Sequence, residues 1–271
     1  MTLSFTKMNG AGNDFVMLDN RDGTLALDRT QIAHLCDRHR GVGADGLLLV
    51  EPPQNGADFR MRYYNADGGE AEMCGNGARC FASYARRVSG NSRETISFET
   101  PAGVIGARCE GDEVQINMST PHSFAPVTRL EAAGETLDVH FLNTGVPHAV
   151  IFVDELESVA ITRLGAAIRH HPHFAPKGTN VNFVHVESPG SIAIRTYERG
   201  VEDETLACGT GVVASALLHS LASGVASPVR VRVRGGDTLR VGFEAGATAG
   251  EFGAVTLTGP ADFVFDGTVT L

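Results

Sequence analysis

The sequence predicts an α+β protein built from two similar domains that arose by internal duplication. Valine and threonine are plentiful and tryptophan is absent, which favours strands over helices. Glycine supplies 32 of the 271 residues, more than the usual share of roughly 7%, which indicates many tight turns. One Cys-Gly-x-Gly segment occurs twice, more than a hundred residues apart, so each copy is expected to organise its own domain.

The two copies of this segment align residue by residue. Residues 70–79 read EAEMCGNGAR, and residues 204–213 read ETLACGTGVV. In each copy a glutamate lies four residues before the cysteine, and Gly, a short polar residue and Gly follow it. The resulting cysteines are Cys74 and Cys208.

Each of the two cysteines is expected at the N-terminus of a helix. Residues 78–88 carry apolar side chains at helical spacing among arginines, and residues 212–218 are apolar on nearly all sides. The backbone N–H groups and the dipole at a helix N-terminus favour a thiolate and offer an anion site beside it.

Apolar runs and alternating patterns predict the other elements of the first half. A helix is expected from Thr30 to the glycines at Gly41 and Gly43. The expected strands cover residues 3–8, 15–18, 47–50, 59–64, 96–100, 103–109 and 114–118.

The segment between the first two strands contains Gly10-Ala11-Gly12-Asn13. A dinucleotide-binding turn is not expected here, because the third glycine is missing and a strand follows instead of a helix. Two interpretations have about equal support: a turn that lets Asn13 approach a ligand, and an ordinary hairpin loop.

The second half repeats the order of strand, polar turn, Cys-Gly-x-Gly helix and hairpin. Arg62 lies twelve residues before Cys74, and Arg195 lies thirteen before Cys208. A helix is expected over 156–170. The expected strands cover residues 137–142, 149–153, 179–186, 191–197, 229–234, 239–243, 255–257 and 262–271.

A Pro- and Ser-rich stretch, residues 119–126, is the expected crossing between domains. The first domain then covers 1–118 and carries Cys74, and the second covers 119–261 and carries Cys208. The C-terminal strand 262–271 is a candidate to join the first domain.

Composition excludes several classes of function. The formal net charge of −10 and the pI near 5.4 argue against nucleic acid and anionic membranes as partners. No apolar run reaches the roughly 18 residues of a membrane span, and the N-terminus lacks a signal-peptide pattern. Five cysteines without C-x-x-C spacing argue against a disulfide framework or a metal site, so a reducing, cytoplasmic location is expected.

Two facing cysteines at helix N-termini suit the inversion of a stereocentre. A thiolate removes a proton from one face of a carbon, and a thiol returns a proton to the other face. The amides at Gly75-Asn76 and Gly209-Thr210 are candidates to bind a carboxylate on that carbon. Cys36, Cys80 and Cys109 lack this context and are expected to be packing residues.

These motifs resemble those of the diaminopimelate epimerase family. The resemblance rests on the segments at residues 10–15, 65–68, 73–80, 197–200 and 207–211. It implies two pseudo-symmetric domains, each a mainly antiparallel sheet wrapped around a central helix. It also implies a homodimeric enzyme without a cofactor or metal, which interconverts LL- and meso-diaminopimelate for lysine and peptidoglycan synthesis.

The resemblance also assigns roles to residues. Cys74 and Cys208 are the acid/base thiols, and His148 and Glu198 lie near them and tune their protonation. The residues expected to contact the substrate are Asn13, Asn65, Gly75, Asn76, Asn180, Glu198, Arg199, Gly209 and Thr210. Asparagines, a carboxylate and an arginine suit a substrate with two carboxylates and two ammonium groups.

Two positions depart from the family pattern. Gly46 stands where the family often has Gln, and Val146 stands where it often has Asn. Both changes concern recognition of the distal end of the substrate, and Asn143 is a candidate to replace the second contact.

Three alternatives remain open on the sequence. A proline or hydroxyproline racemase-like enzyme shares the paired cysteines but acts on a cyclic amino acid. A thiol redox switch would join Cys74 and Cys208 in a disulfide. A non-catalytic amino-acid binding protein would have no use for two mirrored thiols.

Overall fold

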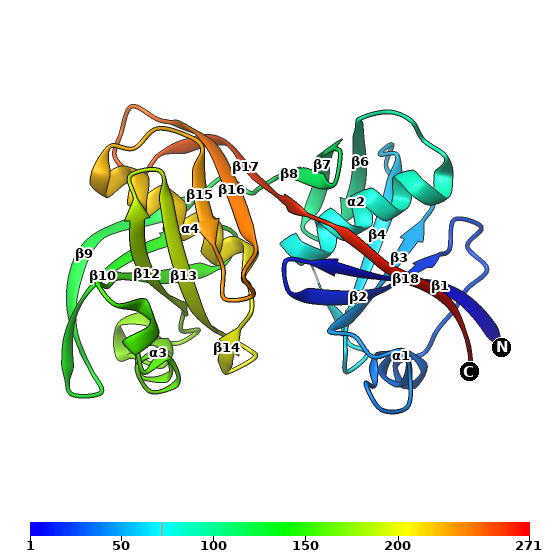
Figure 1. Ribbon diagram of the computed structural model, residues 1–271, viewed down its shortest axis with the longest axis horizontal. Helices are drawn as coiled ribbons and strands as arrows, with labels where there is room; N and C mark the ends of the chain where they lie inside the picture. Colours follow the sequence, from blue (N-terminus) through cyan, green and yellow to red (C-terminus); the bar gives the residue numbers. More distant parts are fainter. Residues whose placement is uncertain (72) are drawn as a thin grey trace. The chain divides into compact units, whose positions relative to one another are not determined.

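The structure, a computed structural model, describes residues 1–71 and 73–271, and these form two units (Figure 1). Glu72, in the first duplicated segment, lies outside the described residues. The first unit comprises Met1–Asn117 and Gly259–Leu271, and the second comprises Met118–Thr258. The chain therefore returns to the first unit for its last strand.

The first unit is a mixed, mainly antiparallel sheet with two helices. Its elements are β1 (Thr2–Gly10), β2 (Asn13–Asp19), α1 (Arg29–Cys36), β3 (Gly46–Glu51), β4 (Phe59–Asn65), β5 (Glu70–Ala71), α2 (Gly75–Ser89), β6 (Thr95–Thr100), β7 (Gly103–Glu110), β8 (Glu113–Asn117) and β18 (Asp262–Thr270). The strands pair in the order β18–β1–β2–β3–β4–β6–β7–β8, and the short β5 pairs with β4. Only β2–β3 and β4–β6 are parallel among these pairs, and α1 and α2 connect them.

The second unit repeats this topology. Its elements are β9 (His122–Ala132), β10 (Glu135–Asn143), β11 (Pro147–Phe152), η1 (Leu156–Ser158), α3 (Ile161–Arg169), η2 (Pro172–Phe174), β12 (Asn180–Ser188), β13 (Ser191–Glu198), β14 (Asp203–Thr205), α4 (Gly209–Ser223), β15 (Val229–Arg232), β16 (Thr238–Ala245) and β17 (Phe252–Pro260). The order is β9–β10–β11–β12–β13–β15–β16–β17, with β14 on β13. Its parallel pairs, β11–β12 and β13–β15, are again connected through helices, α3 and α4. The predicted α+β class and internal duplication are therefore confirmed.

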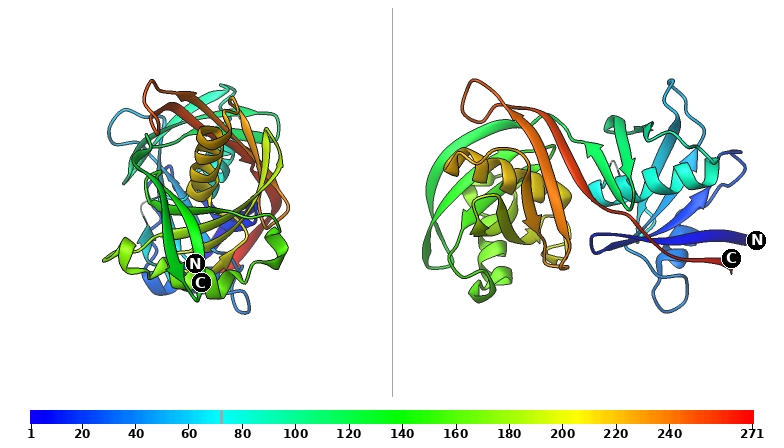
Figure 2. Two further views of the ribbon diagram at one scale, coloured as in Figure 1. Left: turned by 90° about the vertical axis from the view of Figure 1, so that its left-hand side faces the viewer. Right: turned by 45° about the horizontal axis from the view of Figure 1, so that its top comes forward.

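The two central helices, α2 and α4, are matched in length and in both caps. Each has 15 residues, begins directly after a cysteine and ends at a glycine in the left-handed conformation, Gly90 (φ 64°) or Gly224 (φ 72°). Glycine adopts this conformation without steric cost, so it is a strong helix stop. Most of α4 is buried, and Figure 2 shows it inside the curved sheet of its unit.

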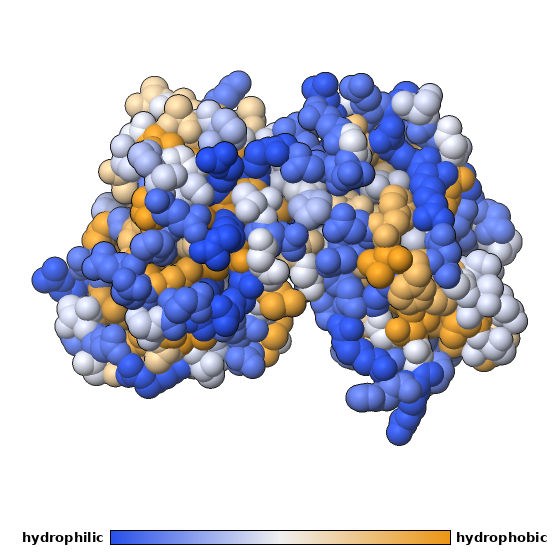
Figure 3. All heavy atoms as spheres, viewed as in Figure 1, coloured by the Kyte–Doolittle hydropathy of each residue, from blue (hydrophilic) through white to orange (hydrophobic). Residues whose placement is uncertain are grey.

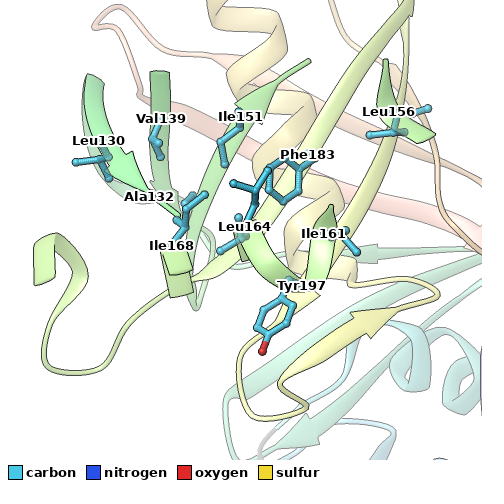
Figure 4. Close-up of a cluster of buried hydrophobic side chains, with 13 residues drawn as sticks. Leu130, Ala132, Val139, Ile151, Leu156, Ile161, Leu164, Ile168, Phe183 and Tyr197 are labelled. Carbon is cyan, nitrogen blue, oxygen red and sulfur yellow. The ribbon is translucent and has the colours of Figure 1, made fainter. Parts of the chain in front are cut away.

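The core of the second unit continues on the other side of its sheet, where α3 packs. Leu164 and Ile168 of α3 lie against Ile151 and Phe183 (Figure 4). Burying an aliphatic or aromatic side chain of this size contributes about 1.5–3 kcal/mol. Hydrophilic residues cover much of the visible surface of each unit, with apolar residues between them (Figure 3).

The helix expected over residues 156–170 is interrupted. A single 3₁₀ turn, η1, precedes α3, and Val159 between them is extended (φ −67°, ψ 123°). The carbonyls of Leu156 and Val159 accept hydrogen bonds from Arg195 Nη1, at 3.1 and 3.3 Å. These tertiary bonds take the place of continued helical bonds.

The expected helix end at Gly41 is also wrong, because α1 ends at Cys36. Asp37 is extended, and its carboxylate accepts from the N–H groups of His39 and Arg40 at 2.7 and 2.9 Å. This local Asx turn competes with further helix. At its other end α1 is capped reciprocally by Asp28 and Gln31.

The stretch 119–126, expected as a domain crossing, already contains the start of strand β9. Most of β9 is exposed and it pairs with β10, so its apolar pattern is weak. Proline is tolerated where a strand has only one partner, which explains Pro126 in it. The short strands β5 and β14 were likewise not expected.

Candidate active site

Both motif cysteines are the N-cap residues of the central helices. Cys74 (φ −136°, ψ 121°) and Cys208 (φ −118°, ψ 107°) have extended backbones, and their carbonyls accept the first helical hydrogen bonds, at 2.7 and 2.9 Å. The N–H groups of the first turn, which begins at Gly75 or Gly209, therefore point toward the helix N-terminus. Each unit thus places a thiol beside backbone donors and the positive end of a helix dipole.

In the first unit, Asn13 and Asn76 are brought together. The Asn76 amide donates to Asn13 Oδ1 at 2.7 Å, and Arg79 Nη2 donates to Asn76 Oδ1 at 2.9 Å. Both Asn76 and Arg79 are buried. The Asn76 side chain therefore holds the helix start against the β1–β2 turn.

The β1–β2 connection is a two-residue hairpin, and Asn13 lies at its end. Gly10 pairs with Asn13, and both central residues have positive φ, Ala11 at 59° and Gly12 at 102°. A side chain at Gly10 would place its Cβ 2.7 Å from the carbonyl oxygen of Asn76. Glycine is needed there because the hairpin backbone touches the first turn of α2.

A charged cluster behind Asn13 orients its amide. Asn13 Nδ2 donates to Asp45 Oδ2 at 2.9 Å, and Arg38 bridges Asp45 and Asp14. Burial raises the pKa of Asp14, but its hydrogen bonds to Arg38 and Lys7 outweigh this and hold the pKa far below its usual range. Asp14 is therefore ionised, and the cluster is an anchored support for Asn13.

Asn65 is exposed at the end of β4, in the turn that leads to Cys74. Its backbone N–H donates to Gly69 and its carbonyl accepts from Gly68, both at 2.9 Å. The structure places Asn65 in the same unit as Cys74, on the strand that β5 joins before α2.

In the second unit, a hydrogen-bonded chain connects Cys208 with His148. Cys208 Sγ lies 3.5 Å from Thr210 Oγ1, and Thr210 Oγ1 lies 2.9 Å from His148 Nε2. His148 is fully buried, and its burial, with the charge of Arg199, lowers its pKa to about 3. The imidazole is therefore neutral at physiological pH.

Asn180, Glu198 and Arg199 meet where β12 begins and β13 ends. Asn180 Oδ1 accepts from the backbone N–H of Arg199 at 2.8 Å, and Asn180 Nδ2 donates to the Pro147 carbonyl at 3.1 Å. Glu198 accepts from the Thr205 hydroxyl at 2.9 Å, and burial raises the pKa of its carboxyl group. Asn180 thus sets the path of the Glu198–Arg199 backbone.

Three cysteines lie outside the motif. Cys36, Cys80 and Cys109 are buried, and burial raises the pKa of Cys36 to about 11 and that of Cys80 to about 12. Cys36 and Cys80 are therefore protonated thiols, as expected of packing residues.

The two departures from the family pattern have different surroundings. A Cβ on Gly46 would lie 2.5 Å from the Tyr64 carbonyl oxygen, so a larger residue would require a backbone shift. Asn143 Oδ1 accepts from the N–H of Gly145 at 3.0 Å, within the turn that holds Val146.

Sequence reasoning missed three residues that organise these half-sites: Asp45, Arg79 and Asn182. Asn182 Nδ2 contacts His148 Nδ1 at 3.1 Å. Its signal was a second asparagine two residues after Asn180, placed between the apolar residues Val181 and Phe183. A buried asparagine in such a strand requires partners for all its polar atoms.

Within residues 1–71 and 73–271, no group of three or more His, Cys, Asp or Glu side chains is arranged to hold a metal ion. None of the helices described is long and apolar enough to cross a membrane.

Comparison with solved structures defines the fold. The chain has the fold of a phenazine biosynthesis protein of the PhzF family from Bacillus anthracis (TM-score 0.72, 16% identity, 100% of both chains). It has the same likeness to a hydroxyproline epimerase from Agrobacterium vitis (TM-score 0.71, 17% identity, 100% of this chain and 93% of the other). These likenesses establish a two-unit α+β fold that several enzymes share.

The chain belongs to the diaminopimelate epimerase family. The family model for diaminopimelate epimerase matches residues 5–132 and 140–264. The chain is 43% identical to the diaminopimelate epimerase of Chlorobaculum tepidum, over 97% of this chain and 100% of that one. It is also 43% identical to the enzyme of Laribacter hongkongensis, over the full length of both. The resemblance noted in the motifs is thereby confirmed.

Proposed function

We propose that this chain interconverts LL- and meso-diaminopimelate with Cys74 and Cys208 as the two acid/base thiols. The observation that carries the proposal is the duplicated N-cap cysteine, at the start of α2 and again at the start of α4. Relatives 43% identical over 97% and 100% of the chain and named diaminopimelate epimerase support the choice of substrate.

The reaction needs one base and one acid on opposite faces of the α-carbon. One cysteine, as thiolate, removes the α-proton while the other, as thiol, donates its proton to the opposite face. One C–H bond breaks and one C–H bond forms, so the protons balance. The two cysteines have then exchanged protonation states. Backbone N–H groups at the helix starts would stabilise the charge that develops on the α-carboxylate.

The remaining site residues are assigned by the same proposal. His148 and Glu198 tune the protonation of the thiols, and the backbone N–H groups at Gly75-Asn76 and Gly209-Thr210 hold the α-carboxylate. Asn13, Asn65, Asn180, Glu198 and Arg199 bind the polar groups of the substrate. The positions of Asn13 beside Asn76, and of Asn180 beside Arg199, support this assignment.

Proton exchange in heavy water under reducing conditions tests the proposal. Wild type, Cys74→Ala and Cys208→Ala would be given LL-diaminopimelate, and meso product and α-deuterium would be measured. We expect wild type to form deuterated meso product and each variant to lose epimerisation at least ~10²-fold, as expected for removal of an acid/base group. Cys80→Ala is the matched control, since its buried thiol lies in α2 and is expected to be dispensable.

Two outcomes would contradict the proposal in different ways. Exchange of proline or hydroxyproline instead of diaminopimelate would keep the two-thiol chemistry and change the substrate. Epimerisation that survives loss of either Cys74 or Cys208 would refute the mechanism.

We also propose a homodimer in the cytoplasm with no nucleic-acid partner. Exposed apolar side chains on β18, namely Phe263 (41%), Val264 (56%) and Phe265 (50%), support self-association. The net charge of −10 disfavours nucleic acid. Sedimentation equilibrium should give twice the chain mass of 28.6 kDa, and Phe265→Lys should reduce it to a single chain.

A further inference from the structure

His148 has a partner at each ring nitrogen, inside the second unit. Asn182 Nδ2 lies 3.1 Å from Nδ1, and Thr210 Oγ1 lies 2.9 Å from Nε2. Because the ring is neutral, one nitrogen donates and the other accepts. The partners decide which of the two carries the proton.

The amide of Asn182 has only one orientation that satisfies its surroundings. Its Nδ2 also donates to the Ala149 carbonyl at 3.1 Å, and its Oδ1 accepts from the Thr196 hydroxyl at 3.0 Å. A carbonyl oxygen cannot donate, so the atom facing Ala149 is the nitrogen. Nδ1 of His148 therefore accepts from Asn182, and Nε2 carries the proton and donates to Thr210.

Thr210 has one hydroxyl proton, and its oxygen already accepts from His148. Within the described part of the chain, the other hydrogen-bonding neighbour of Thr210 Oγ1 is Cys208 Sγ, at 3.5 Å, which is within the range for a hydrogen bond to sulfur. We propose that Asn182 is a positioning residue for Cys208: through His148 and Thr210 it aims a hydroxyl donor at the sulfur and so stabilises the thiolate. The role of Asn182 in catalysis rests on the proposed function, but its effect on the pKa of Cys208 does not.

The second glycine of the motif supports this arrangement. A Cβ on Gly211 would lie 2.3 Å from Asn182 Oδ1 and 3.4 Å from His148 Cε1, so the relay is packed directly against the first turn of α4. The first unit is built differently at the same place. Gly77 faces Leu48 and Phe15 instead.

Two titratable or charged side chains of the second unit, Arg199 and Glu198, bear on the relay or on the segment before Cys208. The charge of Arg199 helps to lower the pKa of His148. Glu198 accepts a hydrogen bond from Thr205, which lies three residues before Cys208. Both stay unchanged in the variants used below, so a change in the pKa of Cys208 reports on the relay.

The test is the titration of Cys208 in a Cys74→Ala background, from the pH dependence of its alkylation followed by peptide mass spectrometry. We expect Thr210→Val to raise the pKa of Cys208 by about one unit, the effect of losing one hydrogen bond to a charged group. Thr210→Ser should restore the wild-type value, because it keeps the hydroxyl.

Asn182→Asp should also raise the pKa of Cys208. The carboxylate would accept from Nδ1, which would make Nε2 an acceptor that takes the Thr210 proton away from sulfur. When Asn182→Asp and Thr210→Val are combined, the two increases in the pKa of Cys208 should not add, because both substitutions remove the same hydrogen bond. Full additivity would mean that the carboxylate acts by its charge alone, and would overturn the proposal.

A second measurement uses wild-type protein and needs no folded variant of Asn182. The ¹⁵N chemical shifts of the His148 ring, assigned by comparison with His148→Gln, should report a protonated Nε2 and an unprotonated Nδ1. A protonated Nδ1 would overturn the proposal. If diaminopimelate were not turned over but Thr210→Val still raised the pKa of Cys208, the proposed function would fail and the relay would stand.

Discussion

Arg195 donates two parallel hydrogen bonds to Glu204, from Nε at 2.7 Å and from Nη2 at 2.8 Å. Arg62 and Glu70 repeat this arrangement in the first unit, with both bonds at 2.9 Å. In each unit the pair joins a long strand to the short strand that leads into the N-cap cysteine. The duplicated spacing of arginine, glutamate and cysteine thus reflects a duplicated ion pair.

The two pairs should differ in their contribution to stability. Arg195 and Glu204 are 10% and 19% exposed, whereas Arg62 and Glu70 are 31% and 41% exposed. We expect Glu204→Gln to lower the free energy of unfolding by about 2–3 kcal/mol, because it leaves a largely buried guanidinium without its charge partner. Glu70→Gln should cost less than about 1 kcal/mol. Urea unfolding measures both, and equal losses would contradict the argument.

The second motif glycines, Gly211 and Gly77, give a matched pair of substitutions. Gly211→Ala should lower the unfolding temperature, because its Cβ would overlap Asn182 Oδ1 at 2.3 Å; overpacking of this kind costs about 1–3 kcal/mol. In Gly77→Ala the nearest neighbours of the new Cβ are Leu48 and Phe15, at 3.3 and 3.4 Å, and the substitution gains about 1 kcal/mol in helix propensity. Calorimetry should show a clear loss for Gly211→Ala and little change for Gly77→Ala. A larger decrease in unfolding temperature for Gly77→Ala than for Gly211→Ala would contradict this prediction.

His148 should make stability depend on pH on the acidic side. Its pKa is near 3 in the folded chain and ordinarily about 6.5 when unfolded, so the unfolded state binds the proton first as pH falls. The contribution is present above about pH 6.5 and is lost as pH falls toward 3. Between pH 7 and 5, wild type should lose about 2 kcal/mol more than His148→Gln. Identical slopes for the two proteins would show that His148 does not stay neutral.

Alkylation should separate the motif cysteines from Cys36 and Cys80. With pKa values raised to about 11 and 12, Cys36 and Cys80 hold almost no thiolate at pH 7, and the thiolate is the species that reacts. Iodoacetamide should therefore label Cys74 and Cys208 and spare those two, as peptide mapping would show. Unfolded protein, in which all five should react, is the control. Rapid labelling of Cys80 in folded protein would be the contrary result.

Local sequence patterns were sufficient for much of the fold. The glycines after Cys74 and Cys208, followed by apolar runs, correctly placed both helix starts, because capping and periodicity involve only neighbouring residues. The patterns failed where contacts between residues far apart in the chain decide the secondary structure. Arg195 interrupts the helix expected over residues 156–170, and the exposed β9 became a strand only through its pairing with β10.

The class of the fold, its duplication, the family and the two N-cap cysteines follow from the amino-acid sequence alone. The orientation of the supporting side chains follows instead from contacts made in the folded chain. These contacts turn Asn76 toward Asn13 and Arg79, and they set Asn182 against His148, 34 residues away. Such orientations depend on the direction of hydrogen bonds between strands and helices far apart in the chain. Spacing along the sequence carries no information about that direction.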